Sequence, residues 1–294
     1  MQKLRNPLAK ALMLTVAFSS LLLALIASAN LVSASSATLV QQNNQGVSFH
    51  ASSFTGTLAF SSSVTSGDVV ALGLEFDSTT SILSVTDSLG SSYTQAVTVG
   101  PSSISGLFAA IYYATLGSSG VDSVMVQVST SNCPGGPSTC HDFFDVYIYE
   151  VSGVTTSGAT TGSGSGTGNS VSTTPTSFAT GAFLLGMTSF ACSGGPGGIC
   201  STSAGSGFTL SPDHSGVDAT LAEYSLSSVS SPTTFPATLG GIVVDWVEAG
   251  LVVNPKNSPP IPEYPLGLPL LAIFLIITYG LMRRRAVAQR RSET

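Results

Sequence analysis

The sequence has little charge, and least of all positive charge. Only 8% of its 294 residues are Asp, Glu, Lys or Arg. Between Asn30 and Pro262 it has thirteen acidic residues but a single basic one, Lys256. Nucleic-acid binding needs a footprint of Lys and Arg that this region lacks. The composition therefore excludes nucleic acid as a partner, and it predicts an acidic surface.

Motifs for catalysis and for cofactor binding are missing as well. The sequence has no Gly-x-Ser-x-Gly elbow of a serine hydrolase, no Asp-x-Asp-x-Asp-Gly calcium loop and no Cys-x2-Cys pair for zinc. From Thr38 to Val253 it also lacks the hydrophobic period of 3.6 residues that predicts helices. We therefore expect a protein that is not an enzyme, has no cofactor and is built from strands.

The middle region has instead many short apolar runs, separated by Gly, Ser, Thr, Asp and Pro. The run Val69–Phe76 is an example. Ten or more such runs predict an all-β fold, an antiparallel, jelly-roll-like β-sandwich that forms one extracellular domain over residues 35–254. We expect the Ser/Gly/Thr-rich stretch Thr155–Ser177 to be a long loop or an irregular edge of this domain. No strong internal repeat is visible.

Four segments of this region together resemble a known module. In chain order they are SVTDSLGSSYT (Ser84–Thr94), IYYATLGSSG (Ile111–Gly120), VYIYEVSGV (Val146–Val154) and AGSGFTL (Ala204–Leu210). The series is similar to a β-sandwich module of secreted bacterial and archaeal surface proteins, in which a D-S-x-G-x-x-Y hairpin precedes a strand ending in an E-Y-S-G-V-like sequence. This resemblance implies a fold but no specific activity. The segment DSLG itself has the residues of a tight turn, with Gly90 at positive φ.

Four cysteines lie in two similar segments, CPGGPSTC and CSGGPGGIC. In a secreted protein, an even number of cysteines at short spacing predicts disulfide bonds. Four cysteines allow three pairings. The Gly-Gly-Pro within each segment lets the chain fold back, which favours the local pairs Cys133–Cys140 and Cys192–Cys200.

The N-terminus has the pattern of a secretory signal peptide. Three basic residues precede an apolar stretch from Ala11 to Ala29, and small residues follow. We assign residues 1–34 to this signal, with cleavage after Ala29 or Ala34. The alternative is an uncleaved membrane helix, because the apolar stretch is about long enough to span a bilayer.

The C-terminus predicts a membrane anchor. A Pro-rich stalk at residues 255–265 precedes an apolar helix at 266–282, and a basic tail follows at 283–294. The tail begins with Arg283, Arg284 and Arg285. Positive charge next to a membrane helix marks the cytoplasmic side, so residues 35–254 should lie outside the cell. We expect a single-pass protein of the cell membrane that displays its N-terminal domain at the surface.

The IPEYP stretch, the apolar helix and the arginines resemble the PEF-type C-terminal sorting tails of archaeal surface proteins. The resemblance implies that an archaeosortase-like membrane enzyme processes the tail. The residues of this processing motif are Pro262, Glu263, Tyr264 and Pro265. Tyr264 stands where Phe is usual in such tails. A plain stop-transfer anchor explains the same residues, and both alternatives stay open.

Acids and histidines of the cysteine-rich regions are further site candidates. Carboxylate oxygens on loops suit calcium. The calcium candidates are Asp142, Asp145, Asp213 and Asp218. His141 and His214, each beside an aspartate, raise the hypothesis of a Ser/His/Asp hydrolase. Solvated turn residues are the simpler interpretation of both sets.

Tyr147 and Tyr149 are candidates for stacking against sugar rings, although aromatic residues on strands often belong to the core. These observations lead to a non-enzymatic, membrane-anchored surface protein. Its role would be in envelope structure, adhesion or surface interaction, with envelope glycans or other surface proteins as partners. A lectin-like, calcium-dependent carbohydrate-binding module is the first alternative. A secreted hydrolase is the second.

Overall fold

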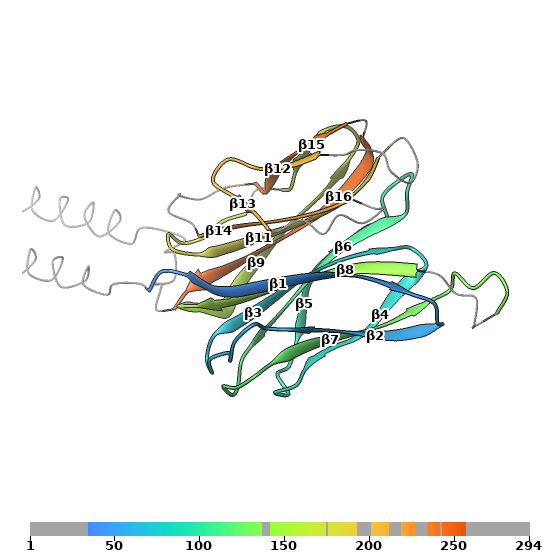
Figure 1. Ribbon diagram of the computed structural model, residues 1–294. Helices are drawn as coiled ribbons and strands as arrows, with labels where there is room; N and C mark the ends of the chain where they lie inside the picture. Colours follow the sequence, from blue (N-terminus) through green and yellow to red (C-terminus); the bar gives the residue numbers. More distant parts are fainter. Residues whose placement is uncertain are drawn as a thin grey trace, which may run out of the picture. The chain divides into compact units, whose positions relative to one another are not determined.

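The computed structural model describes residues 35–136, 142–174, 176–192, 201–211, 219–226, 234–241 and 243–256. These residues belong to one compact unit, Met1–Asn257, and they form sixteen strands and no helix (Figure 1). The predicted all-β class is therefore confirmed. The signal peptide, most of the stalk, the helix at 266–282, the processing motif and the arginines lie outside the described residues. No described segment is a helix of the length and hydrophobicity that a bilayer crossing requires.

The first eight strands form two antiparallel sheets. The first large sheet has the order β1-β8-β3-β6-β5, and the first small sheet has the order β2-β7-β4. The bounds are Thr38–Phe49 (β1), Ser53–Ala59 (β2), Val69–Asp77 (β3), Thr80–Asp87 (β4), Thr94–Val99 (β5), Leu107–Thr115 (β6), Ser123–Thr130 (β7) and Asp142–Ser152 (β8).

The next eight strands also form two antiparallel sheets. The second large sheet has the order β13-β14-β11-β16-β9, and the second small sheet has the order β10-β15-β12. The bounds are Val154–Gly166 (β9), Ser170–Ser172 (β10), Phe183–Cys192 (β11), Ser201–Ala204 (β12), Thr209–Leu210 (β13), Ala219–Leu226 (β14), Pro236–Gly240 (β15) and Val243–Pro255 (β16).

The second half repeats the topology of the first. When β9 to β16 are renumbered one to eight, the large sheet reads 1-8-3-6-5 and the small sheet 2-7-4, as in the first half. The third strands correspond closely, because Gly67 and Gly181 precede them with the same φ of 87° and Phe76 and Phe190 occupy the same place. The expectation of no strong repeat does not hold for the structure. The two halves share a pattern of strands and very few identical residues.

The stretch Thr155–Ser177 is part of this repeat. Most of it forms β9, which is an edge strand of the second large sheet and pairs with β16, and β10 follows. The prediction of a long loop here is wrong, whereas an edge position is correct. Gly164 and Gly166 lie where a Cβ atom would collide with Ser172 and Trp246. The glycines that suggested a loop thus allow close packing of an edge strand.

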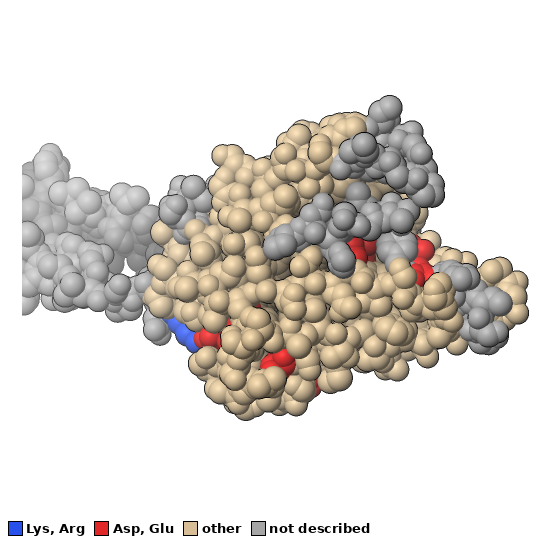
Figure 2. Space-filling view, viewed as in Figure 1, with Lys and Arg blue, Asp and Glu red and all other residues tan. Residues whose placement is uncertain are grey.

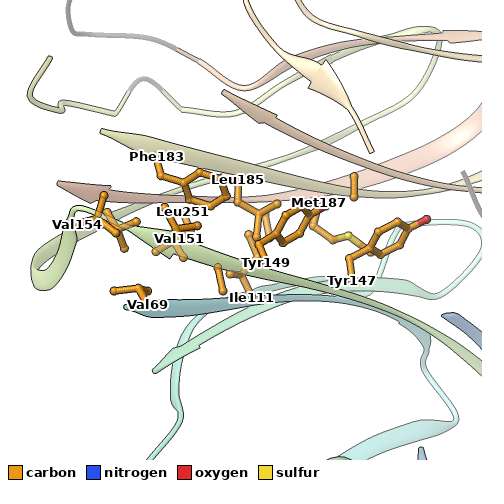
Figure 3. Close-up of a cluster of buried hydrophobic side chains, with 14 of the residues drawn as sticks. Val69, Ile111, Tyr147, Tyr149, Val151, Val154, Phe183, Leu185, Met187 and Leu251 are labelled. Carbon is orange, nitrogen blue, oxygen red and sulfur yellow. The ribbon is translucent and has the colours of Figure 1, made fainter. Parts of the chain in front are cut away.

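The two large sheets pack face to face around the central core (Figure 3). The first large sheet contributes Val69 and Ile111, and the second contributes Phe183, Met187 and Leu251. Each small sheet covers the outer face of its own large sheet, so that four layers result (Figure 1). An inner strand must be apolar on both faces, whereas an outer strand needs one apolar face. This explains why β3 and β11 are continuous apolar runs while β7 alternates.

The start of the first half, the junction of the halves and the end of the second half meet at one place. The Ser35 hydroxyl donates hydrogen bonds to the carbonyl oxygens of Gly153 at 2.8 Å and Lys256 at 3.1 Å. We call this side of the unit the junction end. The opposite side, where β8 and β16 begin and the chain passes Cys133, is called the far end.

Acidic residues lie inside the unit and not on its surface. Ten of the eleven acids among the described residues are buried, and the eleventh, Asp77, is partly buried. The described part of the face drawn in Figure 2 is accordingly mostly neither acidic nor basic, with only small patches of acidic atoms and one basic patch. The prediction of an acidic surface is therefore wrong for the described residues. Backbone amides and the many Ser and Thr hydroxyls solvate most of these carboxylates internally.

Candidate functional site

The far end of the interface between the large sheets holds a buried polar cluster. Glu75 of β3 and Asp145 of β8 are register partners in the first large sheet. Ser189 of β11 donates a hydrogen bond to Glu75 Oε1 at 2.9 Å, and Thr220 of β14 donates one to Asp145 Oδ2 at 2.6 Å. All four side chains are buried. Each half of the molecule thus contributes to the cluster, the first with carboxylates and the second with hydroxyls.

Strand periodicity places these groups. Residues 69, 71, 73 and 75 of β3 share the face toward the second large sheet, as do 145, 147, 149 and 151 of β8. The face is apolar from the junction end to the middle and becomes polar at the far end. Paired carboxylates can transfer protons or bind cations. Both hydroxyls, however, serve the carboxylates as hydrogen-bond donors, and this arrangement holds the two sheets together.

Several predicted site residues lie outside the described part of the chain. These are His141, Asp213, His214 and Asp218. Within the described residues, no group of three or more His, Cys, Asp or Glu side chains is arranged to hold a metal ion.

Asp142 and Asp145 do not form one site. Asp142 Oδ2 accepts hydrogen bonds from the hydroxyls of Thr79 at 2.8 Å, Thr80 at 2.5 Å and Thr130 at 2.6 Å. Thr80 and Thr130 belong to the first small sheet and Thr79 directly precedes β4, whereas Asp145 faces the second large sheet. The two aspartates therefore lie on opposite faces of β8. The structure therefore does not bring Asp142 and Asp145 into one calcium site, and Asp142 joins β8 to β4 and β7. A calcium site that combines one of them with Asp213 or Asp218 stays a prediction, because those two residues lie outside the described part of the chain.

Tyr147 and Tyr149 belong to the central core. Their exposed fractions are 2% and 1%. The Tyr149 hydroxyl lies 2.6 Å from Ser211 Oγ. The centroid of the Tyr149 ring lies 6.0 Å from the ring centroids of Phe183 and Tyr224. A pocket beside the two tyrosines has a volume of about 120 Å³, below the usual size of ligand pockets. Stacking on sugars needs an exposed ring face, so the prediction of a sugar platform is wrong for these residues.

The cysteine prediction is resolved only at Cys133, which is disulfide-bonded. Its position between β7 and β8 puts the bond at the far end. Cys140 and Cys200 lie outside the described residues, and so does the side chain of Cys192. The local pairing stays a prediction.

A second pair of acids escaped the sequence analysis. Glu223 of β14 and Glu248 of β16 are fully buried on the face of the second large sheet that looks toward the small sheet, and both lie against Gly186. Burial raises the pKa of Glu223 to about 8, while a hydrogen bond from the Gly205 amide opposes this rise. Burial and the neighbouring Glu223 raise the pKa of Glu248 well above its ordinary value. The only signal was the presence of acidic residues, Glu248 among them, in the largely apolar run at 243–253.

Comparisons of this chain with protein-family models, with curated proteins and with solved structures give no match. Its function must therefore be argued from the chain's own residues.

Proposed function

We propose that this chain is a non-enzymatic surface protein, secreted by its N-terminal signal and held at the cell membrane by its C-terminal segment. In this proposal, two fused sandwiches form an extracellular unit that acts in envelope structure, adhesion or surface interaction. The strand order 1-8-3-6 beside 2-7-4 in each half supports a jelly-roll-like fold, in which the fifth strand has joined the large sheet.

The observation that carries the proposal is the contact of Ser35 with Gly153 and Lys256. It brings the beginning and the end of the folded unit to the same side. The predicted membrane helix at 266–282 follows Lys256 after nine residues. A tether at that point would hold the junction end near the membrane and direct the far end, with the disulfide at Cys133, outward.

The described surface is compatible with an extracellular location of the protein. Its outermost strands present hydroxyls and few charges; β2, for example, exposes Ser53, Thr55 and Thr57. Large exposed apolar residues are few and separate along the sequence, such as Leu83, Val121 and Leu226. The buried carboxylates of Glu75 and Asp145 accept hydrogen bonds from Ser189 and Thr220 and so join the two large sheets. This arrangement favours a non-enzymatic role over hydrolysis.

The test uses cells that produce the full chain with and without residues 258–294. We expect the full chain in the membrane fraction, and we expect external protease to degrade its folded unit or antibody to reach it on intact cells. The shortened chain should appear in the medium. Intact-mass measurement of the full chain would separate a permanent anchor, which ends at Thr294, from a processed tail. Recovery of the full chain in the cytoplasm would refute the proposal.

The role at the surface needs its own measurement. Cells that lack the protein should show a changed envelope layer in electron micrographs or weaker attachment to each other or to a surface, and the full chain should restore it. A variant with Arg283, Arg284 and Arg285 replaced by Glu is the matched control, because it keeps the folded unit but loses the topology signal. Equal restoration by this variant would argue against a role that depends on surface display.

A further inference from the structure

A separate group of polar side chains lies toward the junction end of the first half. Asp87 ends β4, Ser91 and Tyr93 follow it in the hairpin loop, and Asp122 precedes β7. Asp87 and Asp122 have exposed fractions of 6% and 0%. One oxygen atom of each of the four residues is shielded from solvent and has no hydrogen-bond partner of good geometry among the described residues: Asp87 Oδ2, Ser91 Oγ, Tyr93 Oη and Asp122 Oδ2. The Tyr93 hydroxyl nevertheless lies close enough to Asp87 to interact with its carboxylate.

The other oxygen of each carboxylate holds the loop in place. Asp87 Oδ1 accepts hydrogen bonds from the amides of Leu89 at 3.0 Å and Ser91 at 2.8 Å. Asp122 Oδ1 accepts one from the Ser88 hydroxyl at 2.8 Å. Each carboxylate is thus fixed to the loop through one oxygen, while Asp122 Oδ2 has no hydrogen-bond partner among the described residues and the Asp87 carboxylate also interacts with Tyr93. The tight turn of the D-S-x-G-x-x-Y motif explains why one oxygen of Asp87 accepts hydrogen bonds from loop amides. It does not explain the role of the second carboxylate oxygens.

The carboxylates of Asp87 and Asp122 both interact electrostatically with the hydroxyl of Tyr93. Burial, followed by the charges of Asp87 and Asp122, raises the pKa of Tyr93. The sole Lys or Arg among the described residues is Lys256, and its Nζ donates a hydrogen bond to the Gly67 carbonyl at 2.6 Å. No Lys or Arg among the described residues therefore balances the two acids. Buried carboxylates are costly unless a cation or further hydrogen bonds compensate them.

We propose that Asp87 and Asp122 bind a calcium ion, with Ser91 and Tyr93 as neutral oxygen donors. Two carboxylates and two hydroxyls are hard oxygen ligands, which calcium prefers, and the set contains no nitrogen or sulfur for zinc. Calcium takes about six to eight oxygens in flexible geometry, so water can complete the shell. Ser91 also lines a surface pocket of about 360 Å³ beside the hairpin loop.

Binding can be measured on the full chain in detergent, first stripped with EDTA. Calcium chloride alone is the probe in calorimetry, and terbium replaces calcium for luminescence, which a nearby tyrosine sensitises. We expect calcium to raise the melting temperature and terbium to emit on excitation of tyrosine. Asp122→Asn should weaken calcium binding roughly tenfold or more, because ligand charge sets affinity. Tyr93→Phe should remove most of the terbium emission while both carboxylates still bind calcium.

The matched control is Asp77→Asn. Asp77 also holds a turn through Oδ1, which accepts hydrogen bonds from the amides of Thr79 and Thr80, but it lies at the far end of β3. This variant should bind calcium as the unaltered chain does.

Stability in EDTA separates an ion site from a purely structural pair. Without calcium, Asp122→Asn should melt at the same temperature as the unaltered chain or higher, because it removes one of two unbalanced buried charges. With calcium, the order should reverse. The proposal fails if calcium does not shift the melting of the unaltered chain, or if the shift in Asp122→Asn and Asp87→Asn is as large as in the unaltered chain.

Discussion

Gly73 of β3 lies directly against Met187 of β11 at the centre of the contact between the two large sheets. A Cβ atom at Gly73 would come within 3.0 Å of Met187 Sδ. The two residues occupy the same place in the two halves, since Val69–Phe76 corresponds to Phe183–Phe190. A symmetric pair of sandwiches would need the same residue twice at this point. A fused chain can instead place a glycine against a long side chain, and so bring the sheets closer together.

This contact predicts a coupling between the two positions. Met187→Ala alone should lower the free energy of unfolding by about 2–5 kcal/mol through the cavity it leaves. Gly73→Val alone should lower it by about 1–3 kcal/mol through overpacking. The double variant should lose clearly less than the sum, because the valine fills space that methionine vacates. Urea unfolding followed by Trp246 fluorescence measures all three values.

Gly117→Val is the control for that cycle, since nothing lies within 4 Å of a Cβ at Gly117. It should show no coupling to Met187→Ala. Additive losses at Gly73 and Met187 would contradict the close packing of the two halves.

The Glu223–Glu248 pair predicts an unusual pH dependence. The folded-state pKa of Glu223, about 8, lies above its ordinary 4.5. The stabilising contribution of the protonated group is complete below about pH 4.5 and is lost as the pH rises through 8. The loss amounts to at most about 4–5 kcal/mol. Glu223→Gln, whose amide oxygen can still accept the Gly205 amide, should flatten this slope in urea titrations between pH 5 and 8.5.

Asp77→Asn is a suitable comparison in these titrations, because it removes a carboxylate from a turn and leaves the glutamate pair intact. It should keep the slope of the unaltered chain. The same slope in Glu223→Gln would mean that Glu223 is not protonated in the folded unit at neutral pH.

Asp245 predicts the opposite dependence. Burial tends to raise its pKa, but hydrogen bonds from Ser105, from the Ile104 amide and from Ser102 prevail and lower it. The contribution of the ionised group is present above its ordinary pKa of 3.8 and is lost as the pH falls further. Ser105 Oγ donates to Asp245 Oδ1 at 2.6 Å from the other half of the chain. Ser105→Ala should therefore cost about 1–3 kcal/mol at pH 7.

The cost of Ser105→Ala should shrink as the pH falls below 3.8 and the Asp245 carboxyl becomes protonated, because the hydroxyl then no longer stabilises a charge. Ser103→Ala, an exposed neighbour in the same loop, should change stability by less than about 0.5 kcal/mol. If the two variants lowered the free energy of unfolding equally at pH 7, the contact between Ser105 and Asp245 would not contribute to holding the halves together.

The sequence predicted the class of the fold because strand periodicity depends on local patterns. The apolar run Val69–Phe76, for example, predicts a strand, and it forms β3 at the centre of the first large sheet. The repeat was not predictable in the same way. Topology is set by which strands pair at long range, and the third strands share only Gly67/Gly181 and Phe76/Phe190 as identities. Many apolar residues satisfy the same burial requirement, so the pattern persists while the residues differ.

The candidate site was predicted less well, for a physical reason. The sequence shows charge but not burial, and the carboxylates here are solvated by Ser and Thr hydroxyls and backbone amides. Those donors occur throughout the chain and give no distinctive spacing. The Glu75–Ser189 contact joins residues 114 apart in the sequence. Tyr147 and Tyr149 show the converse error, since alternation along β8 could not tell which face the second sandwich would cover.

The Glu75 cluster allows a final test of whether the far end is structural or functional. Ser189→Ala removes the donor to Glu75 Oε1 and should cost about 1–3 kcal/mol, because a buried carboxylate oxygen loses a partner. If the cluster only joins the two halves, Ser189→Ala should lower stability and leave cell attachment unchanged at temperatures where the protein stays folded. Loss of attachment by a folded Ser189→Ala variant would overturn this interpretation and make the cluster part of a functional site.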